Sequence, residues 1–484
     1  MSRSKVLASS SRTLQLIIGG LLAASLVGSG CDAGYLEGGQ TAGENIRTTQ
    51  ASDAVASWSL LYYLAADNGE EPYADVTLDR LKAATAGLSD HPRILVMFDR
   101  LSVPGTEIFE VVGGAVVPVS SAAEQETSDP KALQDFVTLG LASYALDKVA
   151  VIFKSEGLEW RGIGRDNTHE PEVDDMLMST GDAATALVAA QNAVGKNIDL
   201  LVLEGSQMAF AEVLYEMRSA APILVTTQMR LYDDGIPWKP ILGAMVAAPG
   251  MDGRALASTI VAEHVAFYDE QGNKGNPSSD DFVNFASMVA YDTAHAGAMK
   301  SAFAAWLAVI RPLLADLWNI MPHARDRAEL GGQVAITNAD FQTDLYRFMT
   351  ETVRLADEFE VAIPQPLRDA TDAFAAMYSD LLIAEAHTAK LQSATGMGIW
   401  FPPSWTAWNV DDYSLTSPNP PKFGTTIHYD DPVLALDWVS ETQWVDFLFE
   451  WFDRAADSQS GSGDEEPPKP GKKDEDSKAA NGAP

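Results

Sequence analysis

The sequence predicts an α/β protein: a three-layer sandwich with a mostly parallel central sheet, followed by a mainly helical C-terminal region. Short β-rich runs alternate with helical stretches between residues 58 and 250, as in a sheet whose strands are joined by helical crossovers. Several of these runs, including VAVIF and DLLVL, are apolar without interruption. Such runs are typical of strands covered on both faces.

The predicted elements follow one another in a regular order. Strands are expected at Trp58–Leu64, Arg93–Phe98, Glu107–Val119, Lys148–Phe153, Leu200–Leu203 and Pro222–Thr226. Helices are expected at Tyr73–Ala86, Pro130–Ala145, Asp182–Ala193 and Met208–Ala220. Beyond Gly250, one apolar stripe at helical spacing predicts a core-facing face, formed by Phe303, Trp306, Leu307, Ile310, Leu314, Leu317 and Met321.

The N-terminal segment predicts export and lipidation. Basic residues precede an apolar run at 14–27 and small residues at 28–30, which is the layout of a secretory signal. Cys31, the single cysteine of the chain, follows directly, where a bacterial lipoprotein carries its lipid. We therefore expect an exported lipoprotein of the bacterial envelope, anchored through this lipid alone, with the outer membrane or cell surface as candidate locations. Gly28 replaces the usual Leu, so an ordinary signal peptide is the alternative.

Composition divides the chain into five segments. Residues 1–30 are the signal peptide, and 31–57 hold the lipidated cysteine and a polar, flexible tether. Residues 58–250 form the α/β domain and 251–455 the mainly helical region. Residues 456–484 are rich in Ser, Gly, Pro, Lys and acidic residues, which predicts a disordered tail.

Charge and cysteine content exclude several function classes. The net charge of −35 repels nucleic acid and acidic lipids and favours basic peptides and divalent cations. With one cysteine at position 31, the folded body has no disulfide and no thiol nucleophile. The most apolar later segment, Ser301–Met321, is interrupted by Arg311 and Asp316, so no membrane span is expected.

Two strand ends carry polar loops in which chemistry can occur. The strand ending at Phe153 continues into Lys154-Ser155-Glu156-Gly157, and the strand ending at Leu203 continues into Glu204-Gly205-Ser206. Ligands bind at the carboxyl ends of strands in such sheets. Ser206 is expected on a tight strand-to-helix turn, which favours a nucleophile or an anion site. The alternative is a Ser that only caps the helix.

Six segments resemble the clostripain-like cysteine peptidases, which share the caspase–gingipain fold. WSLLYYLAADNGEEPYADVTLDRL resembles the first strand and acidic loop, ILVMFDR the second strand, and DPKALQDFVTLGLASYALDKVAVIF the elements before the catalytic His. LEGSQMAFAEVLYEMR resembles the segment that bears the catalytic Cys, while DDGIPWKPIL and ATGMGIWFP resemble later family motifs. The resemblance covers roughly residues 57–455 and implies a caspase-like fold.

The departures from the family pattern remove its chemistry. The family's His-containing motif corresponds to residues 154–160, which include Ser155 and Glu156 but no His, and its Cys corresponds to Ser206. A serine hydroxyl depends on a positioned base even more than a thiol does, and the loss of either partner costs orders of magnitude in rate. The resemblance therefore implies a degenerate member with no intact catalytic residue.

Three side chains are candidate replacement bases for Ser206. Glu156 is a poor base because its ordinary pKa is about 4.3. His169 is the nearest histidine in sequence, but its polar loop predicts a solvent-exposed side chain. Lys154 is the third candidate, but its spacing from Ser206 does not match a Ser–Lys pair. The other histidines show no catalytic signature; they are His91, His264, His295, His323, His387 and His428.

Substrate recognition is expected at two carboxylates. Glu204 corresponds to the family's Asp at the pocket for a basic side chain, and Asp166 lies on a neighbouring loop, so together they would receive an Arg or Lys. The alternative for Glu204 is local pairing at the strand end. Some family members use calcium, but the local acidic cluster at 170–175 lacks a calcium-loop spacing. The sequence therefore assigns no metal and no cofactor.

These observations predict a clostripain-related lipoprotein without peptidase activity that binds peptide or protein segments, basic ones in particular. One alternative is an active serine-type hydrolase or peptidase that uses Ser206. Another is a structural envelope lipoprotein that binds no ligand.

Overall fold

The computed structural model describes residues 57–88, 90–144, 147–168, 176–231, 234–271, 285–330, 341–404, 407, 429 and 436–460. The predicted signal peptide, Cys31 and the tether up to residue 56 lie outside the described residues, as do His169, the acidic residues at 170–175, His428 and the tail beyond 460.

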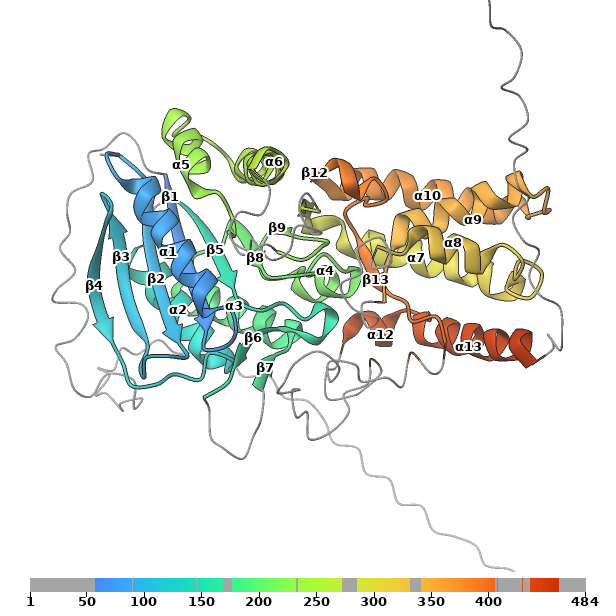
Figure 1. The fold of residues 1–484 in the computed structure, drawn as a ribbon, viewed down its shortest axis with the longest axis horizontal. Helices are drawn as coiled ribbons and strands as arrows, with labels where there is room; N and C mark the ends of the chain where they lie inside the picture. Colours follow the sequence, from blue (N-terminus) through green and yellow to red (C-terminus); the bar gives the residue numbers. More distant parts are fainter. Residues whose placement is uncertain are drawn as a thin grey trace, which may run out of the picture. The chain divides into compact units, whose positions relative to one another are not determined.

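A mixed nine-stranded sheet lies at the centre of the fold, in the order β12-β10-β9-β8-β5-β1-β2-β3-β4 (Figure 1). Its five central strands run parallel; they are β1 (Trp58–Ala66), β2 (Arg93–Arg100), β5 (Lys148–Lys154), β8 (Leu200–Glu204) and β9 (Ile223–Thr226). Antiparallel strands extend both edges; they are β3 (Glu107–Val112) and β4 (Ala115–Ser121) on one side, and β10 (Ser287–Asp292) and β12 (Leu382–His387) on the other.

Strand β1 shows why the sheet is covered on both faces. All nine of its residues are buried, and successive side chains of a strand point to opposite faces. Leu60, Tyr62 and Leu64 belong to one apolar core, whereas Leu61 and Tyr63 belong to the other. The uninterrupted apolar run therefore supplies two cores at once, and the predicted three-layer arrangement is confirmed.

Helices cover the two faces. The core on one face includes side chains of α1 (Glu71–Thr85), α5 (Trp238–Ala247) and α6 (Gly253–Gln271). The core on the other includes side chains of α2 (Pro130–Ser143), α3 (Thr180–Val194) and α4 (Ala211–Met217). A small antiparallel pair, β6 (Ile163–Asp166) and β7 (Met176–Met178), follows β5 and the short helix η1 (Glu159–Arg161).

The prediction of one strand at Glu107–Val119 is wrong, because the chain reverses within it. Gly113 and Gly114 have φ values of 57° and 86°, and the flanking residues pair as a two-residue hairpin between β3 and β4. Two successive residues at positive φ form the turn that best matches the twist of paired strands. The adjacent glycines in the sequence are the feature that could have predicted this turn.

The C-terminal region is mainly helical, as predicted. It comprises η3 (Thr293–His295), α7 (Ala296–Ile310), η4 (Arg311–Leu313), α8 (Met321–Ala328), α9 (Leu345–Glu358), α10 (Gln365–Leu381), η6 (Ala389–Leu391), α12 (Asp437–Glu441) and α13 (Trp444–Ser460), with a two-stranded sheet of β11 (Gln342–Asp344) and β13 (Gly398–Trp400). None of the helices in the described ranges is long and apolar enough to cross a membrane.

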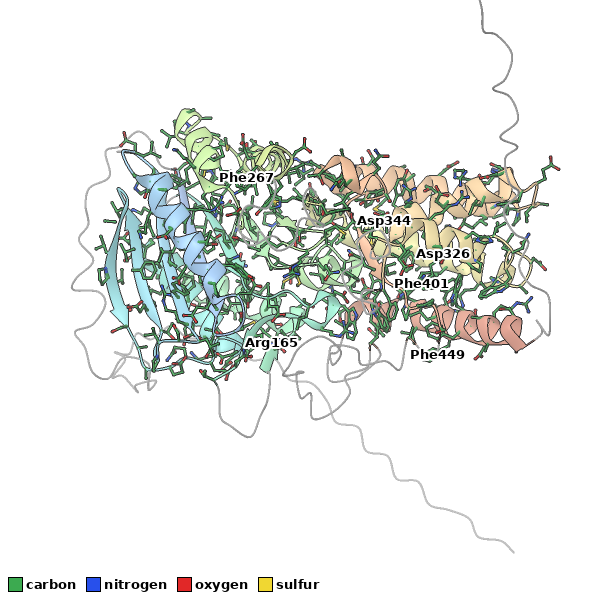
Figure 2. All side chains as sticks on the ribbon, in the orientation of Figure 1. Arg165, Phe267, Asp326, Asp344, Phe401 and Phe449 are labelled. Carbon is green, nitrogen blue, oxygen red and sulfur yellow. The ribbon has the colours of Figure 1, made fainter. Side chains whose placement is uncertain are left out.

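The expected apolar stripe is buried but is not a single helix: it begins in α7, passes through turns at Leu314 and Leu317, and ends at Met321 of α8. All seven of its residues are at most 5% exposed, and α7 ends at Ile310, two residues before Pro312. A proline cannot donate the backbone hydrogen bond that continuation would require. Aromatic side chains complete this core: Phe401 (Figure 2) packs against Phe348 of α9 and Trp444 of α13.

Candidate active site

The polar loops that follow β5 and β8 lie next to each other. The two strands are parallel neighbours, and Lys154 is the register partner of Glu204. Because neighbouring parallel strands end on the same side of the sheet, the two polar loops lie where ligands bind in such folds.

The two loops pack backbone against backbone at Gly157 and Ser206. A Cβ atom added to Gly157 would lie 2.8 Å from the amide nitrogen of Ser206 and closer still to its carbonyl oxygen. Gly205 approaches the same segment, because a Cβ there would lie 3.2 Å from the Gly157 Cα. Only glycine permits this approach, so both glycines determine where the Ser206 backbone lies.

Ser206 is half-buried, and its Oγ accepts a hydrogen bond of 3.1 Å from the amide of Leu231. The predicted helix start at Met208 is wrong: α4 begins at Ala211, and its N-cap is Phe210. The intervening segment is held by other partners, because the Ala209 amide donates to Thr227 and the Ala209 carbonyl accepts from Gly398. Ser206 is therefore neither the cap of this helix nor a residue at its N-terminus.

The polar side chains of the loop after β5 are held by partners within the fold. Ser155 is buried and donates a hydrogen bond of 2.7 Å to the Ala65 carbonyl, and it accepts one from Asn68. The Glu156 carboxylate forms an ion pair with Arg165 at 3.1 Å. The carboxylate weighed as a replacement base is therefore engaged by an ion pair.

Three of the described histidines have contacts away from Ser206. The His91 ring lies 2.6 Å from the Pro92 carbonyl, and His387 pairs with Glu385 at 2.8 Å. His264 is buried against Tyr268, and burial lowers the pKa of its imidazole to about 3. Within the described part of the chain, no imidazole forms a hydrogen bond with the Ser206 hydroxyl.

Glu204 is fully buried and has several partners within the chain. It accepts hydrogen bonds from the Tyr62 hydroxyl and, at 3.3 Å, from the Ile236 amide. Lys154 lies 3.4 Å away and is itself 2% exposed, so the two form a buried ion pair. Burial, with Glu204 as its neighbour, raises the pKa of Tyr62 well above its usual value, so the phenol stays a donor.

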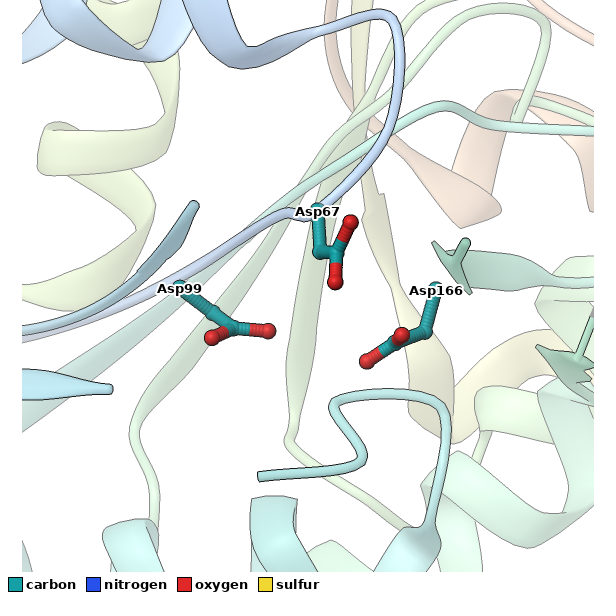
Figure 3. Close-up of side chains that lie close together, drawn as sticks. All are labelled: Asp67, Asp99 and Asp166. Atoms are coloured by element: carbon teal, nitrogen blue, oxygen red, sulfur yellow. The ribbon is translucent and has the colours of Figure 1, made fainter. Parts of the chain in front are cut away.

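Asp166 belongs to a different group of side chains (Figure 3). It ends β6 and lies with Asp67, which directly follows β1, and with Asp99, near the end of β2. One carboxylate oxygen of each lies within 4.8 Å of the others. The described contacts of Asp166 and Glu204 share no residue, so the two carboxylates expected to form one pocket have separate partners.

Burial and mutual repulsion alter this cluster. Burial, opposed by the Thr168 hydroxyl and assisted by the charge of Asp166, raises the pKa of Asp67 to about 6. Burial and the charges of Glu124 and Asp166 raise the pKa of Asp99 to about 8. The sequence reasoning missed Asp67 and Asp99, although both stand at or just beyond the ends of strongly apolar strands, which was the available signal.

Comparison with known proteins identifies the relatives of this fold. A model of the clostripain family matches residues 62–451. A secreted C11 cysteine protease from Bacteroides thetaiotaomicron, in complex with an irreversible peptide inhibitor, is similar with a TM-score of 0.56 and 16% identity, over 80% of this chain and 99% of that one. An inactive zymogen C11 protease from Parabacteroides distasonis is similar with a TM-score of 0.53 and 14% identity, over 82% and 99% of the two chains. No curated protein matches significantly.

Proposed function

Because the chain belongs to the clostripain family, we propose that it is a member without cysteine-peptidase activity that binds peptide or protein segments. The observation that carries this proposal is the absence of a thiol from the body, since the single cysteine is Cys31. Ser206 stands in the segment that resembles the one bearing the family's Cys.

The contacts around Ser206 support an inert site. Its hydroxyl accepts a hydrogen bond from a backbone amide, and the loop that would supply the histidine carries Glu156, which is paired with Arg165. A serine nucleophile requires a base within hydrogen-bond reach to remove its proton. The described residues therefore place neither a thiolate nor a proton acceptor at Ser206 for peptide-bond cleavage.

Retention of the scaffold supports a binding role. The close packing of Gly157 on Ser206 keeps the two strand-end loops in a fixed relation. The net charge of −35 favours basic partners through long-range attraction. Glu204 is already paired with Lys154. We therefore propose that a basic side chain of a partner binds Glu204 by displacing Lys154. We also propose that Asp166, which has separate partners, does not contact this side chain directly.

We further propose that the protein is an exported lipoprotein attached through Cys31. Replacement of Cys31 by Ala should abolish metabolic incorporation of a fatty-acid label and release the protein from the membrane fraction. Persistent membrane attachment of this variant would contradict the proposal.

The catalytic part is tested with the purified protein and reporter peptides that end in Arg or Lys. We expect no turnover and no labelling by a fluorophosphonate probe. Ser206→Cys should remain inactive as well, because the substitution restores the thiol but not its base. Turnover or labelling that is present in the unmodified protein and lost in Ser206→Ala would establish a serine-type hydrolase instead.

The binding part is tested by fluorescence polarisation with a labelled Lys- and Arg-rich peptide. We expect binding that weakens at high salt and that falls about tenfold in Glu204→Gln. Glu212→Gln is the matched control, since Glu212 is equally buried but has different partners, Trp400 and Tyr429. Absence of binding to basic and neutral peptides alike would favour a structural envelope protein that binds no ligand.

A further inference from the structure

Three buried aspartates converge at the carboxyl ends of strands β1, β2 and β6 (Figure 3). Asp67 and Asp99 are fully buried, and Asp166 is 2% exposed. They come from distant positions in the sequence, and their side chains point into the space between them. One oxygen from each lies within 4.8 Å of the other two.

The described residues that donate hydrogen bonds to this cluster are all neutral. Thr127 donates to Asp166 through its amide at 2.8 Å and its hydroxyl at 3.1 Å, and the same hydroxyl lies 3.2 Å from Asp99. Thr106 donates to Asp99 at 3.0 Å, and the Thr168 hydroxyl donates to Asp67. Across the described residues, no ion pair joins any of the three carboxylates to a Lys, Arg or His.

One carboxylate oxygen has no donor among the residues that the structure describes. Asp67 Oδ1 is buried and forms no hydrogen bond within that part of the chain, although the other oxygen of the same group is bonded to Thr168. A buried anionic oxygen without a donor is costly, and three carboxylates close together in a low dielectric repel one another. The described residues therefore supply no positive charge at the place where the oxygens meet.

We propose that Asp67, Asp99 and Asp166 form a calcium-binding site. Calcium binds carboxylate and neutral oxygens at about 2.3–2.6 Å. Oxygens that all contact one such ion lie at most about 4.6–5.2 Å apart, twice that distance, and the three aspartates satisfy this condition. Magnesium binds at about 2.0–2.1 Å and retains several waters, which this buried position does not favour.

The ion would join three separate segments. Asn68, next to Asp67, donates hydrogen bonds to Ser155 at 3.4 Å and to the Arg165 carbonyl at 2.7 Å. Calcium would therefore hold the end of β1 against β6 and steady the loop after β5, beside the candidate site. This inference goes beyond the proposed function, because it holds whether or not the protein binds peptides.

The test uses the purified full chain after treatment with EGTA. Titration with CaCl2 in a calorimeter should show one saturable site, and excess calcium should raise Tm by a few degrees. The same concentration of MgCl2 should give a much smaller shift. Absence of calcium binding, or an equal response to magnesium, would overturn the assignment.

Two variants locate the site. Asp67→Asn and Asp99→Asn should each lose most of the calcium-induced shift, yet in EGTA they should be at least as stable as the unmodified protein, because an Asn amide is neutral at every pH. Asp344→Asn is the matched control: Asp344 is a fully buried carboxylate bonded to Gln228 and Thr395, and this variant should keep the shift whatever its own stability. If both cluster variants retain the full shift, the proposed ligands are wrong. If they do not fold, the calorimetric titration of the unmodified protein still decides whether calcium binds.

Discussion

Replacement of Lys154 by Met should destabilise the protein strongly, because it leaves Glu204 without its counter-charge. The two side chains are 2% and 0% exposed, and their charged atoms lie 3.4 Å apart. Removal of one partner from a buried pair costs about 3–5 kcal/mol in the free energy of unfolding. The Tyr62 hydroxyl and the Ile236 amide still donate to Glu204, so we expect about 3 kcal/mol, the lower end of that range.

The assay is equilibrium unfolding in urea, with the unfolding free energies of the variants compared at one pH. Lys131→Met is the matched control, because its pair with Asp135 is largely exposed, at 59% and 31%, and it should cost less than about 1 kcal/mol. The double variant Lys154→Met with Glu204→Gln should recover much of the loss, since no unpaired charge remains. A loss below about 1 kcal/mol in Lys154→Met would refute a buried, charge-paired Glu204.

Three further predictions concern packing and pH. Gly157→Ala should lower the free energy of unfolding by about 1–3 kcal/mol, because the added methyl group overpacks the contact with Ser206. Gly243→Ala is the control: this glycine of α5 has open space around it, so the change should be neutral or stabilising. Equal effects of the two variants in urea unfolding would contradict the contact between the loops. Because the pKa is raised to about 8 for Asp99 and about 6 for Asp67, the native state in EGTA holds protons that unfolded aspartates, near 3.9, release. Stability should therefore fall as pH rises from about 4 to 8, and Asp99→Asn should flatten this profile of Tm against pH. The pKa of His264 is lowered to about 3, so its neutral form stabilises the fold above about pH 6.5, and this contribution is lost as pH falls toward 3. His264→Phe should therefore reduce the loss of Tm in acid. An unchanged profile of Tm against pH would argue against a buried neutral imidazole.

Local pattern predicted the elements whose residues carry their own signal. The uninterrupted apolar runs predicted β1, β5 and β8 because both faces of these strands are covered. Strands β10 and β12 were not predicted. They lie in a helix-rich region, and they become strands because β10 pairs with β9 and β12 pairs with β10. The start of α4 was misplaced for a similar reason, since Ala209 pairs with segments distant in sequence.

By itself, the sequence determined that the folded body carries no thiol, because residue identity is a local property. It also determined an α/β sheet with polar loops at its strand ends, because apolar periodicity is local as well. Only the tertiary structure decided the partner of Glu204 and brought Asp67, Asp99 and Asp166 together. The register between β5 and β8 sets Lys154 beside Glu204, and the arrangement of β1, β2 and β6 gathers the three aspartates. Such contacts depend on which strands become neighbours, and that choice is made by the packing of the whole core.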